Sequence, residues 1–383
     1  MPKKSGIQPG QSNNEIQPAP HSFPADQGPQ VDPPQPSCDK LQEAQAGQDP
    51  FPPSNRAGCL HTSSRYVDRF DDLPVPTAGS QSVGVRSFRL PLSSAMKARP
   101  SILSCGEVLW DLFPDHPRLG GAPANFACHA SALGGSVFFL TGLGTDDRAG
   151  EAIRILESHG VSTRLIQTIP EKTTGAVDVS FDASGQPRYR IHEDSAWDHL
   201  AWTRDLESQL GGMDAIYFGT LGQRSEPSRQ VIRAVLERAR GSGLMRVLDI
   251  NLRAPFYTPA ILRESVSLAT HVKLNDEELP VVAAACGLQE RLEPREAIMQ
   301  LREAFKLRVV ALTMGAAGAW VSSDQGTLRQ PGFPAEVVDT VGAGDAFTAS
   351  LTLGLLAGTE PGPALHDACQ TASKACTHAG GLP

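Results

Sequence analysis

From Ser101 onward, short apolar segments of strand character alternate with segments of helical period. Residues 101–113 read SILSCGEVLWDLF and residues 136–144 read SVFFLTGLG, with a helix expected at 123–133 between them. MDAIYFGT, SRQVIRAVLERARGSG and MRVLDINLR repeat the strand–helix–strand order, and the series continues to a helix at 343–356. Strands separated by amphipathic helices predict a mostly parallel sheet with helices on both faces. The chain is therefore expected to be an α/β protein.

One segment departs from this order. Residues 173–192, TTGAVDVSFDASGQPRYRIH, alternate apolar and polar side chains around a D-x-S-G turn. Such alternation is typical of a β-hairpin that has one face in water. We therefore expect a flap or lid here, rather than another strand of the main sheet.

The prolines divide the chain into two parts. Of 31 prolines, 15 lie in residues 1–95 and 16 in the remaining 288 residues. The first part shows no sustained period, and a segment that buries little apolar surface cannot offset the entropy lost on ordering. We expect a disordered, proline-rich extension at residues 1–98 and a single domain at residues 99–383. Met96 is an alternative start of the protein, because the sequence after it looks like the beginning of a cytosolic enzyme.

Charge and cysteine usage exclude several classes of protein. The formal net charge is −8 and Lys and Arg form no block, which argues against nucleic acid or an anionic membrane as the partner. No stretch approaches 18 consecutive apolar residues, and the first residues contain no apolar signal segment. The seven cysteines form no C-x-x-C pair, so neither a disulfide framework nor a zinc site is expected. Scattered thiols fit a reducing compartment, and we expect a cytoplasmic protein.

The segment DTVGAGDAF, residues 339–347, is the strongest functional motif. Gly342 and Gly344 permit a tight turn in which successive backbone N–H groups point into one concavity, and the helix that follows adds its positive dipole end. This arrangement predicts an anion hole. Asp345, in the first helical turn, could accept a proton from an attacking hydroxyl. The alternative is a strand-to-helix turn capped by an Asp.

Two other segments could contact a nucleotide, although no Gly-Lys pair exists to form a Walker phosphate loop. Thr313 ends an apolar strand, and Gly315 and Gly318 beyond it would let a nucleotide approach the backbone. Asn275 and Glu278 lie three residues apart, hence on one side of a helical turn. That pair could hold hydrated magnesium and phosphate oxygens, or it could form a capping box at a helix start. The two interpretations can both hold.

Polar residues near two strand ends suit a polyhydroxy ligand. The first set has an Asp and an Asn around a pair of glycines: Asp111, Gly120, Gly121 and Asn125. Such a set suits adjacent hydroxyl groups of a sugar, but in isolation it could be turn chemistry. In DINLR, Asp249 and Arg253 lie at the carboxyl end of another strand, where ligands of open α/β sheets bind. Arg253 could neutralise a transferring phosphate.

In this order, the motifs resemble those of the ribokinase-like (PfkB) family of carbohydrate kinases. GGAPANFACHASALGG, residues 120–135, resembles the first signature of the family and DTVGAGDAF the second, with NDEE and TMGAAG between them. The resemblance covers about residues 101–383. It implies a three-layer α/β/α sandwich with a mostly parallel sheet, plus a small β lid from about residues 108–120 and 173–192. Lid strands in this family often pair across a homodimer.

The resemblance also implies roles for the residues named above. Asp345 would be the catalytic base, and the backbone of Gly342, Ala343 and Gly344 would stabilise the transferring phosphoryl group. The sugar would be bound by Asp111, Gly120, Gly121, Asn125, Arg188, Asp249 and Arg253. ATP would be bound by Asn275, Thr313, Gly315 and Gly318, while Asn275 and Glu278 would organise Mg²⁺ through water. Asp339 and the Val341 carbonyl match positions that bind a monovalent cation such as K⁺ in some members.

The signatures favour fructose as the substrate. GEVLWDLFP, GGAPAN and DINLR look most like fructokinases and next like 2-keto-3-deoxygluconate kinases, whereas ribokinases carry Lys in GGKGAN where this chain has Pro. We expect ATP- and Mg²⁺-dependent phosphorylation of a sugar hydroxyl, with fructose first and 2-keto-3-deoxygluconate or ribose as alternatives. A catalytically silent homologue that binds sugar or nucleotide is the hypothesis from another class. The presence of Asp345, Asn275 and Glu278 argues against it.

Overall fold

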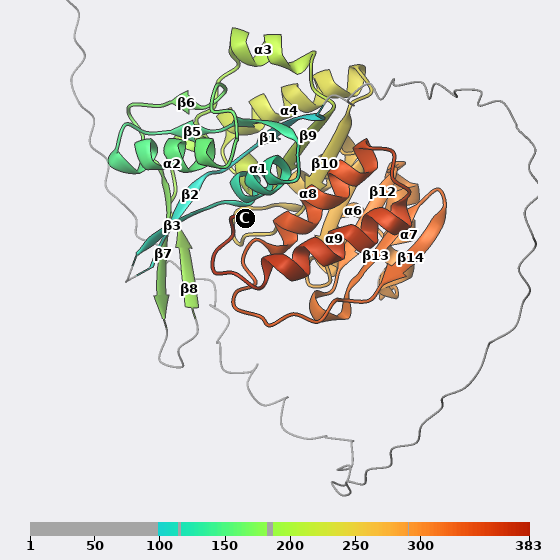
Figure 1. The fold of residues 1–383 in the computed structure, drawn as a ribbon. Coiled ribbons are helices and arrows are strands. Elements are labelled where there is room, and N and C mark those ends of the chain that lie inside the picture. The colour runs from blue at the N-terminus through green and yellow to red at the C-terminus, as the bar shows by residue number, and fades with distance from the viewer. Residues whose placement is uncertain (1–98, 114–115, 182–186, 290) are drawn as a thin grey trace, which may run out of the picture. The chain divides into compact units, whose positions relative to one another are not determined.

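The computed structural model describes residues 99–113, 116–181, 187–289 and 291–383 (Figure 1). The extension predicted at residues 1–98 lies outside the described residues. Within the described ranges, no helix combines the length and the apolar character needed to cross a membrane.

The main sheet has eight strands in the order β14-β13-β12-β11-β10-β9-β1-β4. Six neighbouring strands from β12 to β4 pair in parallel, and β13 and β14 add an antiparallel edge. The prediction of a mostly parallel sheet is confirmed. The strands are β1 (Ser101–Cys105), β4 (Ser136–Leu140), β9 (Ala215–Gly219), β10 (Met245–Asp249), β11 (His271–Asn275), β12 (Val309–Thr313), β13 (Ala319–Ser323) and β14 (Gly326–Gln330).

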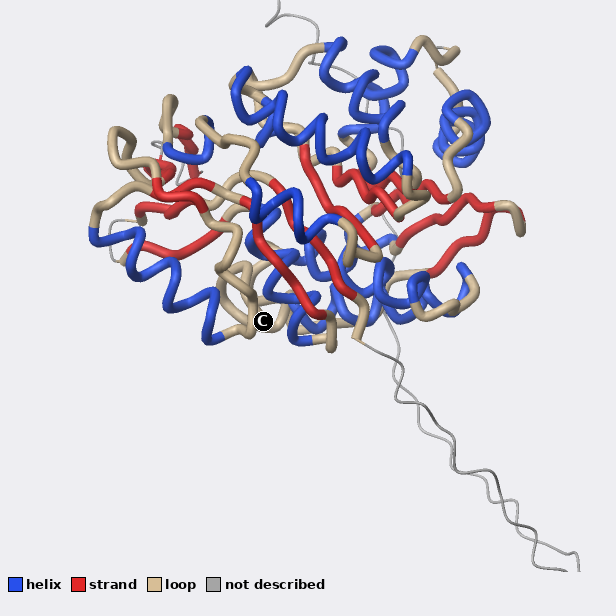
Figure 2. The backbone as a smooth tube through the Cα atoms, turned by 90° about the horizontal axis from the view of Figure 1, so that it is seen from above, coloured by secondary structure: helices blue, strands red, loops and turns tan. Residues whose placement is uncertain are grey.

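Helices cover both faces of this sheet (Figure 2). One face packs against α1 (Ala122–Ala132), α2 (Asp147–Ser158), α8 (Ala343–Leu356) and α9 (Pro361–Ala375). The other packs against α3 (Arg204–Leu210), α4 (Glu226–Gly241), α5 (Pro259–Leu268), α6 (Glu278–Cys286) and α7 (Pro294–Phe305). The predicted three-layer α/β/α architecture is therefore confirmed.

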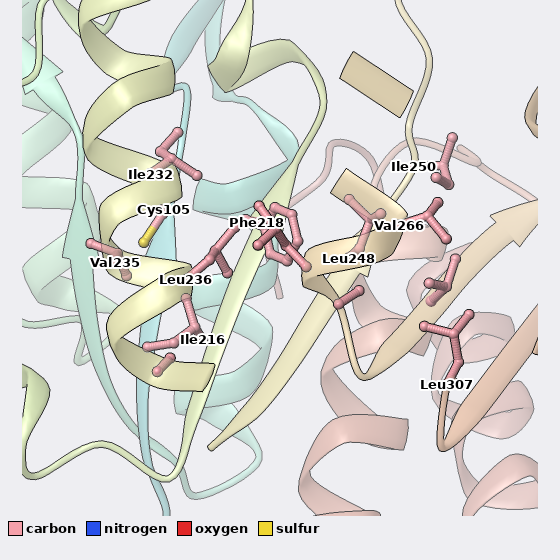
Figure 3. Packing of buried hydrophobic residues seen from close by; sticks show 14 of the residues in the cluster. Cys105, Ile216, Phe218, Ile232, Val235, Leu236, Leu248, Ile250, Val266 and Leu307 are labelled. Carbon is pink, nitrogen blue, oxygen red and sulfur yellow. The ribbon is translucent and has the colours of Figure 1, made fainter. Parts of the chain in front are cut away.

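Alternate residues of the central strands supply the two apolar layers. Ile216 of β9 joins the cluster under α4, whereas its neighbour Tyr217 joins the cluster under α1. Figure 3 shows the α4 layer, where Ile232 and Leu236 pack toward Phe218 of β9. Because both faces are buried, these strands read as nearly continuous apolar runs rather than as alternating ones.

A separate four-stranded sheet has the order β3-β2-β7-β8. Its strands are β2 (Leu109–Leu112), β3 (Pro117–Gly120), β7 (Gly175–Phe181) and β8 (Pro187–Ile191). β7 and β8 pair antiparallel, as expected for the hairpin at residues 173–192, and β2 pairs with β7 in parallel. A pair of two-residue strands, β5 (Gly142–Leu143) and β6 (Gln167–Thr168), completes the sheets of the described part.

The start of β7 differs from the expected strand with one wet face. Gly175, Ala176 and Val177 are all buried, so both faces of the strand are covered at this end. A Cβ at Gly175 would lie 2.5 Å from Nε1 of Trp197, which belongs to the short 3-10 helix η2 (Ala196–Asp198). The indole therefore packs directly on the strand, a contact that strand periodicity does not reveal.

Candidate active site

Polar residues lie at the carboxyl ends of the central parallel strands. Asp249 is the last residue of β10, Asn275 of β11 and Thr313 of β12. Asp249 is the register partner of Lys273, and Asn275 is the partner of Thr313, so these strand ends lie side by side. Ligands of open α/β sheets bind at this edge.

Asp345 and Asn125 meet at this edge from two different helices. Nδ2 of Asn125, in α1, donates a hydrogen bond of 2.9 Å to Oδ2 of Asp345, in the first turn of α8. Burial raises the pKa of Asp345 to about 7, helped by the nearby Asp249 carboxylate and opposed by Asn125, Lys273 and Arg253. A carboxyl group with this pKa changes charge near neutral pH, as a general base requires.

A buried ion pair lies beneath Asp345. Nζ of Lys273 lies 3.1 Å from Oδ1 of Asp249, and the hydroxyl of Thr348 donates a 2.9 Å hydrogen bond to Oδ2 of the same carboxylate. Burial alone would lower the pKa of Lys273, but the carboxylates of Asp249, Glu278 and Asp345 raise it above its ordinary value. Both atoms of the Asp249 carboxylate are thus engaged inside the protein. This geometry gives Asp249 a supporting position under Asp345, whereas the sequence suggested direct contact with sugar.

Lys273 was not among the predicted site residues. Its signal in the sequence is a lysine inside the apolar strand HVKLN. A buried lysine is rarely stable without an acidic partner. That partner is 24 residues away in the sequence, and only the register of β10 against β11 brings the two together.

The backbone turn before α8 is closed tightly by the last residues of the chain. Gly342 has a φ of 78°, and a Cβ there would lie 2.4 Å from the carbonyl oxygen of Gly381. A Cβ at Gly344 would lie 3.0 Å from Nζ of Lys273, so the buried ammonium sits directly behind this turn. In the first turn of α8, the N–H of Ala343 donates to the Thr340 carbonyl at 3.3 Å, and the helix itself offers no partner to the N–H groups of Gly344 and Asp345. The turn is therefore shaped to hold an anion, with a positive charge behind it.

Replacing Gly342 by Ala should destabilise the protein because the new methyl group collides with the Gly381 carbonyl. Gly358→Ala is the matched control, since Gly358 has a φ of 79° but no atom within 4 Å of the added Cβ. Both variants carry the backbone strain of about 1–3 kcal/mol, and only Gly342→Ala adds the collision. Urea unfolding should show a larger loss for Gly342→Ala. Equal losses would mean that segment 379–382 does not press on the turn.

The small sheet contributes Asp111, which pairs in register with Arg118. A Cβ at Gly120 would lie 2.9 Å from Oδ2 of Asp111, so the glycine leaves room for this carboxyl group. Burial raises the pKa of Asp111 to about 6, against the opposing effect of Arg253 and Arg118. Gly121, with a φ of 102°, precedes α1 and connects this strand to the helix that carries Asn125. The structure thus brings the predicted sugar residues Asp111, Gly120, Gly121, Asn125 and Arg253 into one neighbourhood.

Glu107 is a second residue that sequence reasoning did not single out. It is only 2% exposed, and burial raises its pKa to about 7 despite nearby backbone N–H groups and the guanidinium groups of Arg253 and Arg224. Burial raises the pKa of the Tyr217 hydroxyl, and the carboxyl groups of Asp249, Asp345, Glu107 and Glu278 raise it further. All four acids therefore act electrostatically on the same buried hydroxyl. A glutamate directly after an apolar strand, in CGEVLW, was the available signal.

Asn275 and Glu278 form a reciprocal capping box at the start of α6. The N–H of Glu278 donates to Oδ1 of Asn275, and the N–H of Asn275 donates to Oε2 of Glu278, each at 2.8 Å. Oε1 of Glu278 accepts the N–H of Leu252 at 2.9 Å. Burial raises the pKa of Glu278, and Lys273 opposes this. The capping interpretation is confirmed. The Glu278 carboxylate also links the loop after β10 to the end of β11, because it accepts a hydrogen bond from each.

These contacts restrict how a divalent cation could bind. In the described part of the chain, no group of three or more His, Cys, Asp or Glu side chains could enclose a metal ion. Mg²⁺ commonly keeps several waters and binds through one or two carboxylates and the substrate's phosphates. The oxygens of Asn275 and Glu278 already accept backbone N–H groups, which fits contact with Mg²⁺ through water rather than a cage of direct protein ligands, and their role toward Mg²⁺ stays a prediction.

The residues expected around the nucleotide lie at the end of β12 and just after it. Thr313 lies beside Asn275 and donates a 3.4 Å hydrogen bond to the Leu274 carbonyl. Gly315 has a φ of 51° and open space around it, whereas a Cβ at Gly318 would lie 2.0 Å from the Gln330 carbonyl. Gly318 is therefore required by the close approach of β14, and Gly315 is free to face a ligand.

Three further predicted residues are Asp339 and Val341, just before the glycine turn, and Arg188 on the small sheet. The Asp339 carboxylate accepts the N–H of Val341 at 3.0 Å and the N–H of Gly380 at 2.9 Å, on the side of the turn that faces the C-terminal segment. Arg188 lies on the exposed strand β8, three residues from Ile191, which shares the β7 partner of Asp111. The cation role of Asp339 and Val341 and the sugar contact of Arg188 stay predictions.

A cavity of about 640 Å³ lies between the small sheet, α2 and segment 379–382. Trp110, Leu119, Arg148 and Gly381 contribute to its wall, and neither Asp345 nor Asn125 does. A Cβ at Gly381 would lie 2.6 Å from Nδ2 of Asn125, so this glycine separates the cavity from the acidic site. The cavity is a neighbour of the candidate active site, not the site itself.

Comparisons with known proteins agree with this geometry. The model of the pfkB family of carbohydrate kinases matches residues 116–382. A fructokinase of Klebsiella pneumoniae is 30% identical over 263 residues, which are 66% of this chain and 83% of that protein. The crystal structure of a Vibrio cholerae O395 fructokinase with fructose, ADP and calcium bound is 25% identical, with a TM-score of 0.62, covering 74% of this chain and 94% of that one. A Xylella fastidiosa fructokinase with bound ATP, 23% identical with a TM-score of 0.64 over 74% of this chain and 95% of that one, has the same fold.

Proposed function

The chain belongs to the pfkB family of carbohydrate kinases, and on this premise we propose that it transfers the γ-phosphoryl group of ATP to a hydroxyl of a neutral sugar, with fructose as the preferred acceptor. The observation that carries the proposal is Asp345. Its carboxyl group has a pKa of about 7, is held by Asn125, and lies in the first turn of α8 beside the glycine turn.

Each group near this edge supports one part of the reaction. Asp345 accepts the proton of the sugar hydroxyl as its oxygen attacks the γ-phosphorus, and the bond from that phosphorus to the β,γ-bridging oxygen breaks to release ADP. Asn125 orients the Asp345 carboxylate, and the Gly342, Ala343 and Gly344 backbone donates N–H groups to the transferring phosphoryl oxygens. Asn275 and Glu278 would hold Mg²⁺ through water, and the ion would neutralise charge on the phosphates.

The buried carboxyl groups around the expected sugar site favour a neutral acceptor. Burial raises the pKa values of Glu107, Asp111 and Asp345 to about 7, 6 and 7, and Arg253 opposes the rise at all three. Arg224, Arg118 and Lys273 each oppose it at one of the three. Burial still disfavours every ionised carboxyl group here, so a further carboxylate on the substrate would be disfavoured in the same way. This argues for fructose or ribose over 2-keto-3-deoxygluconate, whose carboxylate would add repulsion. The Klebsiella pneumoniae and Vibrio cholerae relatives, both named fructokinases, favour fructose over ribose.

A panel of free sugars tests the proposal. ADP release from ATP and Mg²⁺ should be stimulated most by fructose, less by ribose, and least by 2-keto-3-deoxygluconate. A preference for 2-keto-3-deoxygluconate would contradict the charge argument. No stimulation by any sugar or by adenosine would support a silent, ligand-binding homologue instead. The homodimer through small-sheet strands, K⁺ at Asp339 and Val341, and a cytoplasmic location stay predictions alongside this proposal.

The pKa of Asp345 predicts how activity depends on pH. A carboxylate base acts only when ionised, and burial raises the pKa of Asp345 from 3.8 to about 7. The kcat/KM for the sugar should therefore be lost as pH falls, with half of the plateau value near pH 7. Initial rates measured from about pH 5 to about pH 9 check this, because an ordinary Asp would keep full activity throughout that range. A flat profile would exclude a buried base with a raised pKa.

A further inference from the structure

Arg224 is a buried arginine outside the group of residues expected to bind ligands. It follows the short 3-10 helix η3 (Leu221–Gln223) and makes a bidentate pair with Asp198, with Nε 2.9 Å from Oδ1 and Nη2 2.6 Å from Oδ2. The two side chains are 6% and 3% exposed. Nη2 also donates a 2.6 Å hydrogen bond to the carbonyl of His192, the residue after β8. The end of the outer strand of the small sheet is thus bound to this guanidinium.

Two aromatic rings enclose the same guanidinium. Its carbon lies 4.0 Å from the centre of the Trp197 ring and 4.7 Å from the centre of the Phe256 ring. Trp197 packs on Gly175, the first residue of β7. Phe256 belongs to the loop after β10 that carries Arg253. Arg224 therefore contacts one ring that packs on the start of β7 and another that lies in the Arg253 loop.

Glu107, in the connection from β1 to β2, lies beside η3, because a Cβ at Gly222 would lie 3.5 Å from Oε2 of Glu107. The charge of Arg224, which follows η3, lowers the pKa of the Glu107 carboxyl, in the sense opposite to burial. Among the described residues, neither Nη1 of Arg224 nor Oε2 of Glu107 has a hydrogen-bond partner, although both atoms are buried. The N–H of Ala122, at the start of α1, also stabilises the ionised Glu107 carboxyl. Glu107 thus lies between Arg224 and the turn at Gly121.

The Arg224 guanidinium therefore lies close to three segments in which the chain passes between the main sheet and the small sheet. These are the approach to β2 at Glu107, the approach to β7 beneath Trp197, and the exit from β8 at His192. We propose that Arg224, held in place by Asp198, is a positioning residue. It fixes the positions of the small sheet and of the Arg253 loop, which carry residues expected to bind the sugar. A lysine could not replace it, because an ammonium lacks the planar fork for Asp198 and the flat surface for the two rings.

The kinetic consequence rests on the proposed function. Arg224 contacts His192 after β8, Trp197 beside β7 and Phe256 in the Arg253 loop, and β7 is the partner strand of β2, which carries Asp111. In the described part of the chain, its hydrogen bonds, ion pair and ring contacts involve no residue of β11, β12 or α8. Arg224→Lys should therefore raise the KM for the sugar about 10-fold or more, since a hydrogen bond to a charged group is worth about that factor. The KM for ATP should stay within about 2-fold of the wild-type value, a change no larger than that of an ordinary surface substitution. Arg229→Lys is the matched control, because Arg229 forms an ion pair with Glu264 on α5 and contacts none of these segments.

Amide hydrogen exchange of the protein without ligand tests the proposal independently of activity. In Arg224→Lys, amides of β7 and β8 should exchange about 10-fold faster than in the wild type, while those of β10 and β11 keep their rates. If Arg224→Lys does not fold, Asp198→Asn should show the same pattern, because it removes one charge-assisted acceptor and keeps the side-chain volume. Unchanged exchange in β7 and β8 together with an unchanged sugar KM would overturn the proposal. If the wild type phosphorylates no sugar, the proposed function fails, and the exchange rates alone still decide the role of Arg224.

Discussion

Asp345→Asn should lower kcat by at least about 10²-fold and up to about 10⁴-fold, the range that a general base contributes. The substituted amide has nearly the same shape and can still accept the hydrogen bond from Asn125, which is 2.9 Å long in the native protein. It cannot take up the proton of the sugar hydroxyl. The KM for the sugar should therefore change by less than about 10-fold, so that the loss falls on kcat. Initial rates at saturating ATP with a sugar series measure both constants.

The stability of the same variant separates a chemical defect from a structural one. Burial and the Asp249 carboxylate raise the pKa of Asp345. A raised carboxyl pKa gives stability that is complete at pH values below the unfolded pKa and is lost as pH rises through the folded value of about 7. Above that pH the native Asp345 carries its buried charge, which Asn removes. Asp345→Asn should thus have a Tm equal to or above that of the wild type at about pH 8.

Asp276→Asn is the control for Asp345→Asn, because Asp276 is an exposed carboxylate next to Asn275 at the same edge of the sheet. Its kcat should match that of the wild type within about 2-fold, as expected for a surface change. A kcat near the wild-type value for Asp345→Asn would remove Asp345 as the base. A kcat loss accompanied by a lower Tm would show that the substitution had damaged the fold instead.

Lys273→Met should have the largest effect on stability. Removing the lysine leaves the Asp249 carboxylate, which is 1% exposed, without its ionic partner. Breaking a buried pair in this way costs about 3–5 kcal/mol. The loss of its positive charge should also raise the pKa of Asp345 further, since Lys273 lowers it in the native protein. The acid limb of the pH–rate profile should then move to higher pH. Urea unfolding gives the free energy, and initial rates give the profile.

Two further variants test why Lys273 matters. Lys273→Met combined with Asp249→Asn removes both charges, so most of the lost stability should return. Lys374→Met, at an exposed position near the end of α9, should change the free energy of unfolding by no more than about 0.5 kcal/mol. A loss below about 1 kcal/mol for Lys273→Met alone would contradict a buried, paired lysine.

Local signals in the sequence predicted the architecture and the glycine turn. The apolar runs and helical periods from Ser101 onward are properties of neighbouring residues, so the sheet and its two helical layers could be read from them. Gly342 and Gly344 are similar, because two glycines just before a helical period are a local signal of a tight turn, although the residues that crowd them, Gly381 and Lys273, are distant in the sequence. The capping box of Asn275 and Glu278 was also predictable, because its partners are three residues apart.

The positioning residues could not be predicted because their partners are distant in the sequence. Lys273 needs the register of β10 and β11 to meet Asp249, and Arg224 needs η2, 26 residues earlier, to meet Asp198. Asp249 shows the same limit. Its place at a strand end suggested sugar binding, yet the hydroxyl of Thr348, 99 residues later, and Lys273 occupy its carboxylate. Which way a strand-end side chain points depends on these partners.

The product of the reaction is the most direct test of a kinase that uses Asp345 as its base. Phosphorus-31 NMR of the wild-type protein with ATP, Mg²⁺ and fructose should show a new phosphomonoester of the sugar, formed in equal amount to ADP. Under the same conditions Asp345→Asn should form it at least about 10²-fold more slowly. ADP that appears with inorganic phosphate and no sugar phosphate, or equal rates of sugar phosphorylation in the two proteins, would contradict the account.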